Sequence, residues 1–358
     1  MLKRDNIHHS WRAINGYNKA FNFCIGAREP GKTDSIWYEN IYSPWTKDKK
    51  PWIYLVRKSV EITEALINSI IEVNINKWIE NPVEVKYNKG NFKDGIVDVF
   101  LNKELFFRIV SLSIDLRRIK LAVVKNIKGV FMDEYIIDPR SQEKYIPNEA
   151  FKIKEAYTTW RRESDGMLKF YFAGNPYSLY NPLFVEWGVD VNKLSSMMDF
   201  KKGAFYVGDT YVIQWVVLNP LLREKLLRDN PLYQFDEDYN AYALKGVAVN
   251  DRNIRIGSMP LHYNLRLIVR LSDINIGIFQ NNYFEDGEDI FYCKEVDNFS
   301  ADRSIFTFDF ESMVDRSILV SIDERRKLER FKTAFRKRQV VFSNINVYYM
   351  IKEVYQNI

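Results

Sequence analysis

The stretch FNFCIGAREPGKTDSIW, residues 21–37, decides how this sequence folds, because GAREPGKT within it matches the phosphate-binding pattern G-x-x-x-x-G-K-[ST]. Such a match is informative where a buried strand precedes it and a helix follows it. Residues 20–25 form a short, mostly apolar run that is typical of an interior strand. The residues at helical spacing after the lysine are Ile36, Trp37, Asn40 and Ile41. This context favours a phosphate-binding loop over a glycine-rich turn with an exposed lysine.

Each part of the loop has a predicted role. Gly26 and Gly31 allow positive φ angles, which turn backbone N–H groups toward phosphate oxygens. The N-terminus of the following helix directs its positive dipole end at the same point. Lys32 is predicted to reach the β- and γ-phosphates of ATP, and Thr33 to hold Mg²⁺ through its hydroxyl.

A metal-orienting carboxylate is predicted in the segment IKGVFMDEY, residues 127–135. Its apolar run ends at Asp133, at the carboxyl edge where parallel sheets bind ligands. Asp133 is expected to take Mg²⁺ through water, and Glu134 to polarise the attacking water as general base. A surface Asp-Glu pair after a strand is the alternative, but the phosphate-binding loop upstream argues against it.

Two further candidates follow. The apolar run MLKFYFAG precedes Asn175, which is placed to sense the γ-phosphate or the attacking water, although an Asn-Pro turn after a core strand is an equal alternative. The segment TTWRRESDG places Arg161 and Arg162 at a predicted helix end. Either arginine could complete the site of a neighbouring subunit, or the two could be a solvated pair.

Composition favours a soluble intracellular enzyme. The 358 residues are 46% hydrophobic and 15% aromatic, and they leave room for two domains with a sizeable core. No apolar run is long enough for a transmembrane helix, and the first residues lack the apolar segment of a signal peptide. Cys24 and Cys293 show no pairing pattern, so we expect a reducing compartment and no zinc site. Because no long apolar run exists, we also expect no membrane partner.

The chain is expected to have three parts. Residues 1–195 alternate strands with helices, including a strand at 51–58, a long helix at 60–79 and a lid-like β-hairpin that turns at Asn102-Lys103. Residues 196–250 contain Asn-Pro breaks and are predicted to form a small helical linker domain. Residues 251–358 show alternating strand patterns followed by two helices.

Positive charge is concentrated near the C-terminus. The whole chain carries +5, whereas residues 321–338 alone hold eight Lys/Arg against three Asp/Glu. Leu328, Phe331 and Phe335 mark the apolar face of a helix whose opposite face suits a phosphate backbone or is simply solvated. The candidate nucleic-acid contacts of this segment are Arg325, Arg326, Arg330, Arg336, Lys337 and Arg338. Arg57 and Lys58, which end the strand at 51–58, are weaker candidates for a translocation channel.

The order of motifs resembles that of the DNA-packaging ATPase of small podophages with terminal-protein-capped genomes. The motifs are GAREPGKT, VFMDEY, KYIPNEA at 144–150, TTWRR, YFAGNP and the NP-x(4)-NP-x-F run at 175–184. The match covers the N-terminal half by motif and the remainder by layout and length. It implies an α/β P-loop NTPase of the additional-strand, catalytic-glutamate class, a linker, and an α+β RNase H-like C-terminal domain that has lost its nuclease.

The resemblance also implies a motor that drives double-stranded DNA into a preformed capsid. Its expected setting is a homopentameric ring in the host cell cytoplasm, docked transiently on the prohead portal with a structural prohead RNA and the terminal protein on the genome end. Lys32 and Thr33 match the phosphate and metal residues, and Asp133 and Glu134 the metal carboxylate and the base. Arg161 or Arg162 matches the trans-acting finger. Arg28 matches a second arginine within the loop, where the neighbouring Glu29-Pro30 departs from the family's small residues.

Two rival functions follow from the same residues. A terminase-like motor with an active nuclease would need three or four carboxylates converging from separate strands. The candidates are Asp273, Asp286, Glu288, Asp289, Asp309 and Glu311, and they form no evident converging set, so we predict no cleavage. A P-loop switch or nucleotide kinase that never touches DNA is the other rival, because P-loops serve many chemistries.

Overall fold

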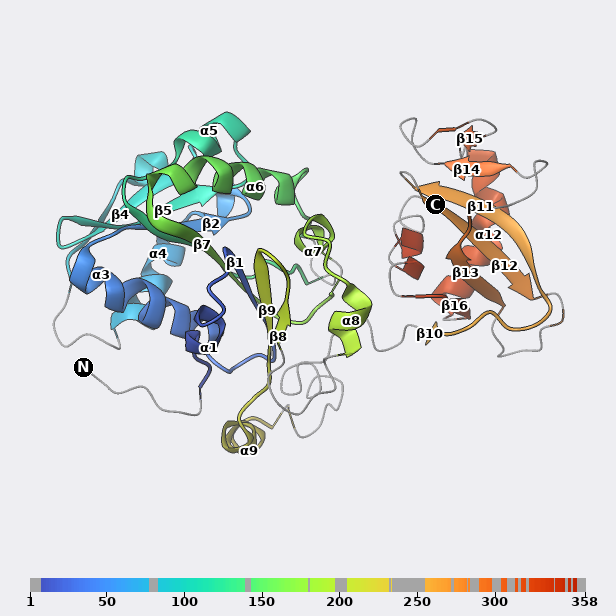
Figure 1. Ribbon diagram of the computed structural model, residues 1–358, viewed down its shortest axis with the longest axis horizontal. Coiled ribbons are helices and arrows are strands. Elements are labelled where there is room, and N and C mark those ends of the chain that lie inside the picture. The colour runs from blue at the N-terminus through green and yellow to red at the C-terminus, as the bar shows by residue number, and fades with distance from the viewer. Residues whose placement is uncertain are drawn as a thin grey trace. The chain divides into compact units, whose positions relative to one another are not determined.

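The computed structural model divides the chain into two compact units, Met1–Val249 and Asn250–Ile358 (Figure 1). The residues described are 8–76, 83–138, 143–179, 181–196, 205–231, 233, 255–271, 274–281, 283, 290–297, 304–307, 313–314, 317–319, 322–337, 339–344, 347–348 and 350–352. Among these residues, no helix is long and apolar enough to span a bilayer.

The first unit is built on a nine-stranded sheet with the order β3-β4-β5-β2-β6-β7-β1-β9-β8. The strands are β1 Phe21–Gly26, β2 Trp52–Val56, β3 Val85–Tyr87, β4 Ile96–Leu101, β5 Glu104–Ser111, β6 Ile127–Met132, β7 Ser164–Gly174, β8 Phe205–Val207 and β9 Tyr211–Val216. The six central strands from β5 to β9 run parallel, and β4, β3 and β8 add antiparallel edges. Parallel strands place their carboxyl ends at one edge, so residues that follow β1, β6 and β7 meet there.

Helices cover both faces of this sheet (Figure 1). They are α1 Arg12–Asn15, α2 Lys32–Ser35, α3 Ser43–Asp48, α4 Glu64–Ser69, α5 Leu116–Leu121, α6 Glu149–Trp160, α7 Pro182–Glu186, α8 Val191–Ser196 and α9 Pro220–Asp229. π-helical turns at Ile36–Tyr42 and Ile70–Ile75 continue α2 and α4. Successive side chains of a strand point to opposite faces of the sheet. Trp52, Tyr54 and Val56 of β2 therefore share one face, where they join the core cluster that also contains Trp37 and Ile71. Burial on both faces explains why the central strands are apolar almost throughout.

The elements predicted around the phosphate-binding loop are confirmed. β1 is buried along its whole length, and a helix begins at Lys32. The strand predicted at 51–58 is β2. The helix predicted from residue 60 begins later, at Glu64, because the Thr63 hydroxyl accepts a hydrogen bond from the Leu66 N–H and caps it.

The predicted hairpin at Asn102-Lys103 is present, but it is not a lid. Asn102 and Lys103 have φ angles of 50° and 72°, as a two-residue turn between β4 and β5 requires. β5 pairs in parallel with β2, so the hairpin extends the sheet instead of covering a site. Alternation of buried and half-buried residues in β4 reflects this packing of one strand face on the core.

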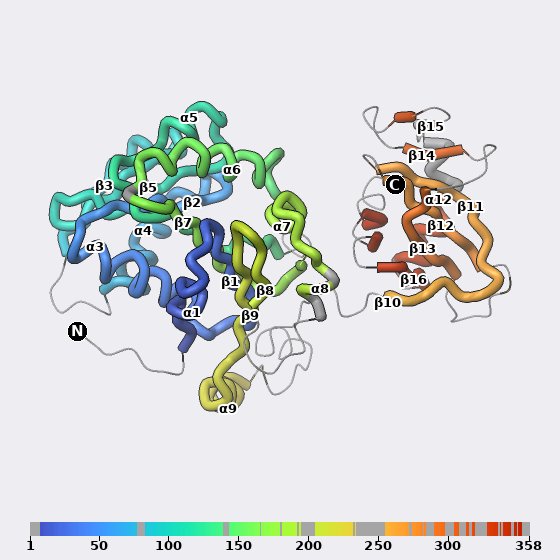
Figure 2. The backbone as a smooth tube through the Cα atoms, viewed as in Figure 1, coloured from blue at the N-terminus to red at the C-terminus, as the bar shows by residue number. Residues whose placement is uncertain are grey.

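The prediction of a separate helical domain at 196–250 is wrong for residues 205–216. β9 pairs in parallel with β1 and β8 pairs with β9, so both strands complete the sheet of the first unit. Figure 2 shows β9 beside β1, with β8 next to β9, although both strands are far from β1 in sequence. α9 follows β9, and residues 234–250 lie outside the described part of the chain.

The second unit contains a seven-stranded sheet with the order β10-β16-β13-β12-β11-β14-β15. The strands are β10 Arg255–Ile256, β11 Tyr263–Leu271, β12 Ile274–Asn281, β13 Phe291–Glu295, β14 Ile305–Thr307, β15 Ser317–Leu319 and β16 Val340–Phe342. The alternating patterns that the sequence shows after residue 251 correspond to β11, β12, β13 and β14. β10, β15 and β16 were not predicted, because their two or three residues stand in no longer alternating run. β14 is equally short, but the alternating sequence RSIFTFDF at 303–310 marks it.

The basic helix predicted near the C-terminus is α12, Ile322–Arg336. Leu328 and Phe331 are buried, and Phe335 packs against the same core, as the apolar spacing predicts. A T-shaped contact between Phe331 and Phe291 joins the helix to β13. The second unit thus has a core of its own, assembled from its sheet and α12.

Candidate functional site

The candidate site lies at the carboxyl edge of β1, β6 and β7. Registers of Ile25 with Gly174 and of Met132 with Phe172 align the ends of these three strands. The residues next in sequence therefore converge: the phosphate-binding loop from β1, Asp133-Glu134 from β6 and Asn175 from β7. The separate motifs in the sequence form one site.

The loop after β1 depends on its two glycines. Gly26 and Gly31 have φ angles of 145° and 78°. A Cβ on Gly26 would lie 2.2 Å from the Val216 carbonyl oxygen of β9, so a side chain at this position would separate the two strands. Gly31 precedes α2 directly, which leaves the first N–H groups of the helix facing the loop. This arrangement can bind an anion such as a phosphate.

Lys32 is buried at the centre of the loop. Its ammonium donates hydrogen bonds to the carbonyl oxygens of Gly26 and Ala27 and, at 3.3 Å, to Oδ1 of Asn175. Burial lowers the pKa of Lys32 to about 8, and the charges of Cys24 and Asp133 oppose that shift. A phosphate bound here would be a counter-charge for the buried ammonium of Lys32.

Asp133 and Thr33 face each other across the loop. The Thr33 hydroxyl donates a hydrogen bond to the Asp133 carboxylate, and burial raises the pKa of that carboxyl to about 6. A hydroxyl and a carboxylate are oxygen ligands of the kind that Mg²⁺ takes with one or two protein groups and phosphates. Burial is the largest cause of this raised pKa, and the nearby charge of Lys32 opposes it only in part. The donor set, a hydroxyl beside a buried carboxylate, therefore fits Mg²⁺. Within the described ranges, no group of three or more His, Cys, Asp or Glu forms a metal cluster.

Glu134 is exposed beside Asp133, in a left-handed conformation with φ of 50°. Its backbone N–H donates to Asp133 Oδ1 at 3.0 Å. Both carboxylates line the same cavity, Asp133 at the hydroxyl of Thr33 and Glu134 on the exposed side. Among the described residues, Glu134 is the only predicted site residue other than a glycine that has a positive φ.

A cavity of about 500 Å³ joins these groups. Its lining residues are Arg28, Glu29, Pro30, Gly31, Lys32, Thr33, Asp34, Val73, Asn74, Asp133, Glu134, Gly174 and Asn175. Sequence reasoning missed Val73 and Asn74, which reach the site from the π-helical turn after α4. No motif marks them, because only the folding of that helix against α2 brings them to the loop.

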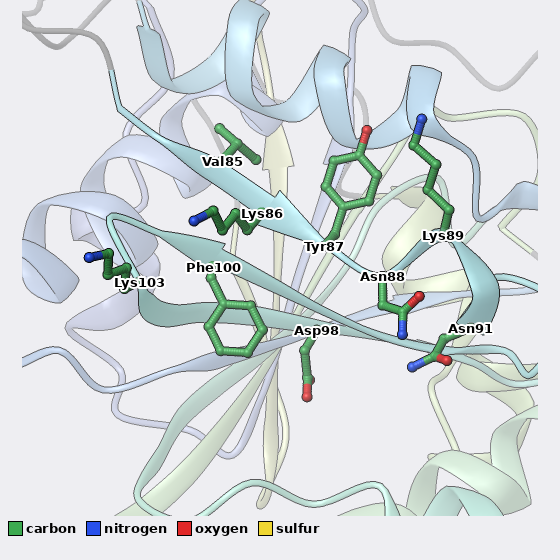
Figure 3. Close-up of a pocket in the computed structure, with 9 residues that line it drawn as sticks. All are labelled: Val85, Lys86, Tyr87, Asn88, Lys89, Asn91, Asp98, Phe100 and Lys103. Atoms are coloured by element: carbon green, nitrogen blue, oxygen red, sulfur yellow. The ribbon is translucent and has the colours of Figure 1, made fainter.

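A larger cavity, of about 760 Å³, lies elsewhere in the first unit. Figure 3 shows its lining side chains, which come from β3, β4 and the turns beside them. Lys86 and Lys89 at its rim are paired with Glu84 and Glu64. No predicted catalytic or binding residue contributes to it, so we place the chemistry in the smaller cavity.

Arg161 and Arg162 do not enter the site of their own chain. They are exposed in a short turn before β7, where Ser164 pairs with Ile127 at the amino end of β6. The six residues of β6, about 20 Å of strand, separate this amino end from Asp133 at the carboxyl end. The structure thus leaves these arginines able to act only outside their own pocket.

Arg57 is a correction to the predicted nucleic-acid contacts. Its side chain is 7% exposed and forms an ion pair of 2.8 Å with Glu149, whose side chain is 0% exposed. An arginine held in this way cannot meet a nucleic acid. Lys58 is half-buried at the end of β2 and stays a candidate.

The basic candidates of α12 are placed in part. Arg330 and Lys337 are exposed, on or directly after the helix. Arg325, Arg326 and Arg336 lie within the helix, and Arg338 lies outside the described residues. All six candidate nuclease carboxylates also lie outside the described residues.

Comparisons with known proteins identify the fold. No protein-family model matches the chain, and no curated protein matches it. Among solved structures, the bacteriophage Phi-29 viral genome packaging motor assembly matches with a TM-score of 0.68 and 17% identity, covering 98% of this chain and 99% of that one. The Phi-28 gp11 DNA packaging motor matches with a TM-score of 0.57 and 16% identity, over 98% of each chain. The predicted likeness to packaging ATPases is therefore confirmed at the level of the fold, along the whole chain.

Proposed function

We propose that this protein is an ATP-hydrolysing motor that moves viral double-stranded DNA into a preformed capsid. The observation that supports it is the convergence of Lys32, Thr33, Asp133, Glu134 and Asn175 on one cavity, in a fold similar from end to end to that of two DNA-packaging motors. A lysine that binds phosphate beside an Asp-Glu pair suits hydrolysis of ATP, in which positioning and charge provide nearly all of the catalysis.

We assign the first unit to the additional-strand, catalytic-glutamate class of P-loop ATPases. The support is the strand order, in which β7 lies between β1 and β6 and so separates the phosphate-binding loop from the Asp133 strand by one additional strand. In this assignment Glu134 is the base that polarises the attacking water.

The remaining groups of the site have complementary roles. Lys32 binds the β- and γ-phosphates, with Arg28 beside it, while Asn175 contacts the γ-phosphate or the water. Thr33 and Asp133 hold Mg²⁺, which neutralises charge on the phosphates when it is bound. Loss of the γ-phosphate removes the negative charge that Lys32 binds, so the site can relax after each turnover.

We infer a ring in which Arg161 or Arg162 reaches the nucleotide of the neighbouring subunit. Their exposure, and their distance from their own pocket, support action in trans. An arginine there would stabilise charge that develops during phosphoryl transfer. The resemblance further suggests a homopentamer.

The second unit is proposed to be an RNase H-like domain that has lost its nuclease. Its support is the run β13-β12-β11-β14-β15, in which the first three strands are antiparallel and β14 and β15 continue in parallel. The basic face of α12 and Lys58 are proposed to contact DNA. The portal, the prohead RNA and the terminal protein on the genome end are the proposed partners, met when the motor docks on the prohead in the host cytoplasm.

The test is ATP hydrolysis by the full chain, with and without long double-stranded DNA. We expect DNA to stimulate the wild type, and Arg161→Ala or Arg162→Ala to abolish turnover. Mixing that inactive variant with Glu134→Gln should restore part of the activity, since each variant supplies what the other lacks.

Other outcomes would point elsewhere. If DNA has no effect and neither arginine matters, the protein is a solitary P-loop ATPase or kinase. Metal-dependent nicking of plasmid by the purified protein would indicate a motor with an active nuclease.

A further inference from the structure

Arg57 and Glu149 form a buried, bidentate ion pair next to the loop after β6 that carries Asp133 and Glu134. Nε of Arg57 donates to Oε2 of Glu149 at 2.8 Å, and Nη2 donates to Oε1 at 3.0 Å. Burial acts to lower the pKa of Arg57, but its bonds to Glu149 outweigh burial and raise it. The arginine is therefore a fixed cation with a planar fork of donors.

The guanidinium of Arg57 also contacts the backbone of Glu134, the candidate base, and of Tyr135. Nη2 also donates to the Tyr135 carbonyl oxygen at 2.9 Å, and Nη1 lies 3.5 Å from the Glu134 carbonyl oxygen. Glu134 is in a left-handed conformation, which is about 1–2 kcal/mol unfavourable for a residue with a Cβ. Such a conformation persists only where neighbouring contacts hold it.

Glu149 is held in its turn by the segment before α6. Its Oε2 accepts a hydrogen bond from the Ile146 N–H at 3.3 Å. The Tyr145 ring lies 5.2 Å from the Arg57 guanidinium, and its hydroxyl accepts a bond from the Ile137 N–H. The KYIPNEA motif, which has no assigned role in the site, thus folds around the partner of Arg57.

We propose that Arg57 and Glu149 are positioning residues that hold the Asp133-Glu134 loop so that the Glu134 carboxylate is aimed at the attacking water. The proposal rests on the function proposed above. Neither side chain lines the nucleotide cavity, so both act through the backbone of residues 134 and 135. Buried ion pairs add little net stability compared with apolar pairs, whereas a bidentate fork fixes position.

The chain offers a matched control in Arg108. This arginine forms a bidentate pair with Asp98 and also donates to two backbone carbonyls, those of Ala122 and Val123. Those carbonyls precede β6, at the edge opposite the site. Arg57→Lys and Arg108→Lys therefore each remove a bidentate guanidinium–carboxylate pair, one beside the Asp133-Glu134 loop and one away from it.

The experiment measures kcat for ATP, the Kd of a fluorescent ATP analogue with Mg²⁺, and the unfolding temperature of the full-length variants. Because a displacement of about 1 Å can cost up to about a hundredfold in rate, we expect Arg57→Lys to lower kcat at least about tenfold. Its Kd should change less than about threefold, since no ligand contact is lost. Arg108→Lys should keep kcat within about twofold, and it should lose less stability because its ion pair with Asp98 is more exposed than that of Arg57 with Glu149.

A second arm tests whether the pair acts through Glu134. In the Glu134→Gln background, adding Arg57→Lys should lower the residual single-turnover rate by less than about twofold, because the group that Arg57 positions is already gone. Equal loss of kcat in the Arg57 and Arg108 variants, or an undiminished kcat in Arg57→Lys, would overturn the proposal. Undiminished hydrolysis by Glu134→Gln itself would instead remove the proposed base, which separates failure of the site from failure of the positioning pair.

Discussion

At the scale of single residues, the site combines two groups whose pKa values are displaced toward each other. Burial raises the pKa of Asp133 to about 6 and lowers that of Lys32 to about 8. Burial disfavours both charged forms, and the mutual attraction of Lys32 and Asp133 offsets that effect only in part, so each group still favours an added counter-charge. A metal for the carboxylate and a phosphate for the lysine would supply those charges together, which explains why nucleotide and Mg²⁺ are expected to bind as a unit.

The Asp133 shift predicts a pH dependence of Mg²⁺ binding. With the pKa of Asp133 at about 6, the carboxylate is ionised above that pH and takes up a proton below it, where protons compete with the metal. Mg²⁺ affinity of the complex with a fluorescent ATP analogue should therefore fall as the pH drops from 7 to 5. Asp133→Asn is the control, because its remaining pH dependence belongs to the nucleotide. Identical pH profiles for the two proteins would contradict the prediction.

At the scale of elements, the turn of the β4–β5 hairpin requires a positive φ at two residues, and only one of them, Asn102, is suited to it. Asn102 suits a positive φ, and its Oδ1 also accepts a bond from the Glu84 N–H at 2.9 Å. Lys103 has a φ of 72° and no such compensation among the hydrogen bonds of the described residues. The turn is thus fixed by strand pairing against a local preference.

Lys103→Gly is predicted to stabilise the protein by about 0.5–1 kcal/mol, because glycine adopts positive φ without a Cβ clash. The measurement is the denaturant midpoint of the first unit's unfolding. Lys103→Ala keeps the clash and should give no gain, and Asn102→Gly should lose stability with its bond to Glu84. A gain in the alanine variant equal to that in the glycine variant would show that loss of charge, and not backbone strain, is responsible.

At the scale of the whole molecule, the two units have separate sheets and separate cores. Every residue that lines the nucleotide cavity belongs to the first unit. All eight tryptophans also lie within residues 1–249, which makes their fluorescence a probe of that unit alone.

Nucleotide with Mg²⁺ should therefore stabilise one unit selectively. At about 100 times its Kd, a ligand adds about 2.7 kcal/mol to the state that binds it. We expect the unfolding transition followed by tryptophan fluorescence to move to higher temperature, while a second transition seen by circular dichroism stays in place. Lys32→Ala, which lacks the phosphate-binding ammonium, should show no shift. Coincident transitions that move together would mean that the two units unfold as one.

Local sequence was sufficient to identify most of the residues that converge on the cavity and the elements that present them. Gly26, Gly31 and Lys32 are recognisable because a phosphate-binding turn needs positive φ angles and a helix N-terminus within a few residues. Asp133 and Asn175 could be placed because each follows an apolar strand, and parallel strands end at one edge. These inferences use contacts that are short in sequence or fixed by strand direction.

Contacts between distant segments determined the rest. Arg57 has the sequence context of an exposed channel residue. Glu149, 92 positions away, instead pairs with it in the interior, where Arg57 also donates to the carbonyl of Tyr135. Residues 205–216 belong to the sheet because β1 pairs with β7 on one side and with β9 on the other. No local sequence pattern predicts this pairing between distant strands. Val73 and Asn74 reach the cavity because their helix packs on α2. Burial and strand pairing depend on what the remainder of the chain brings alongside a residue, and therefore only the assembled fold specifies them.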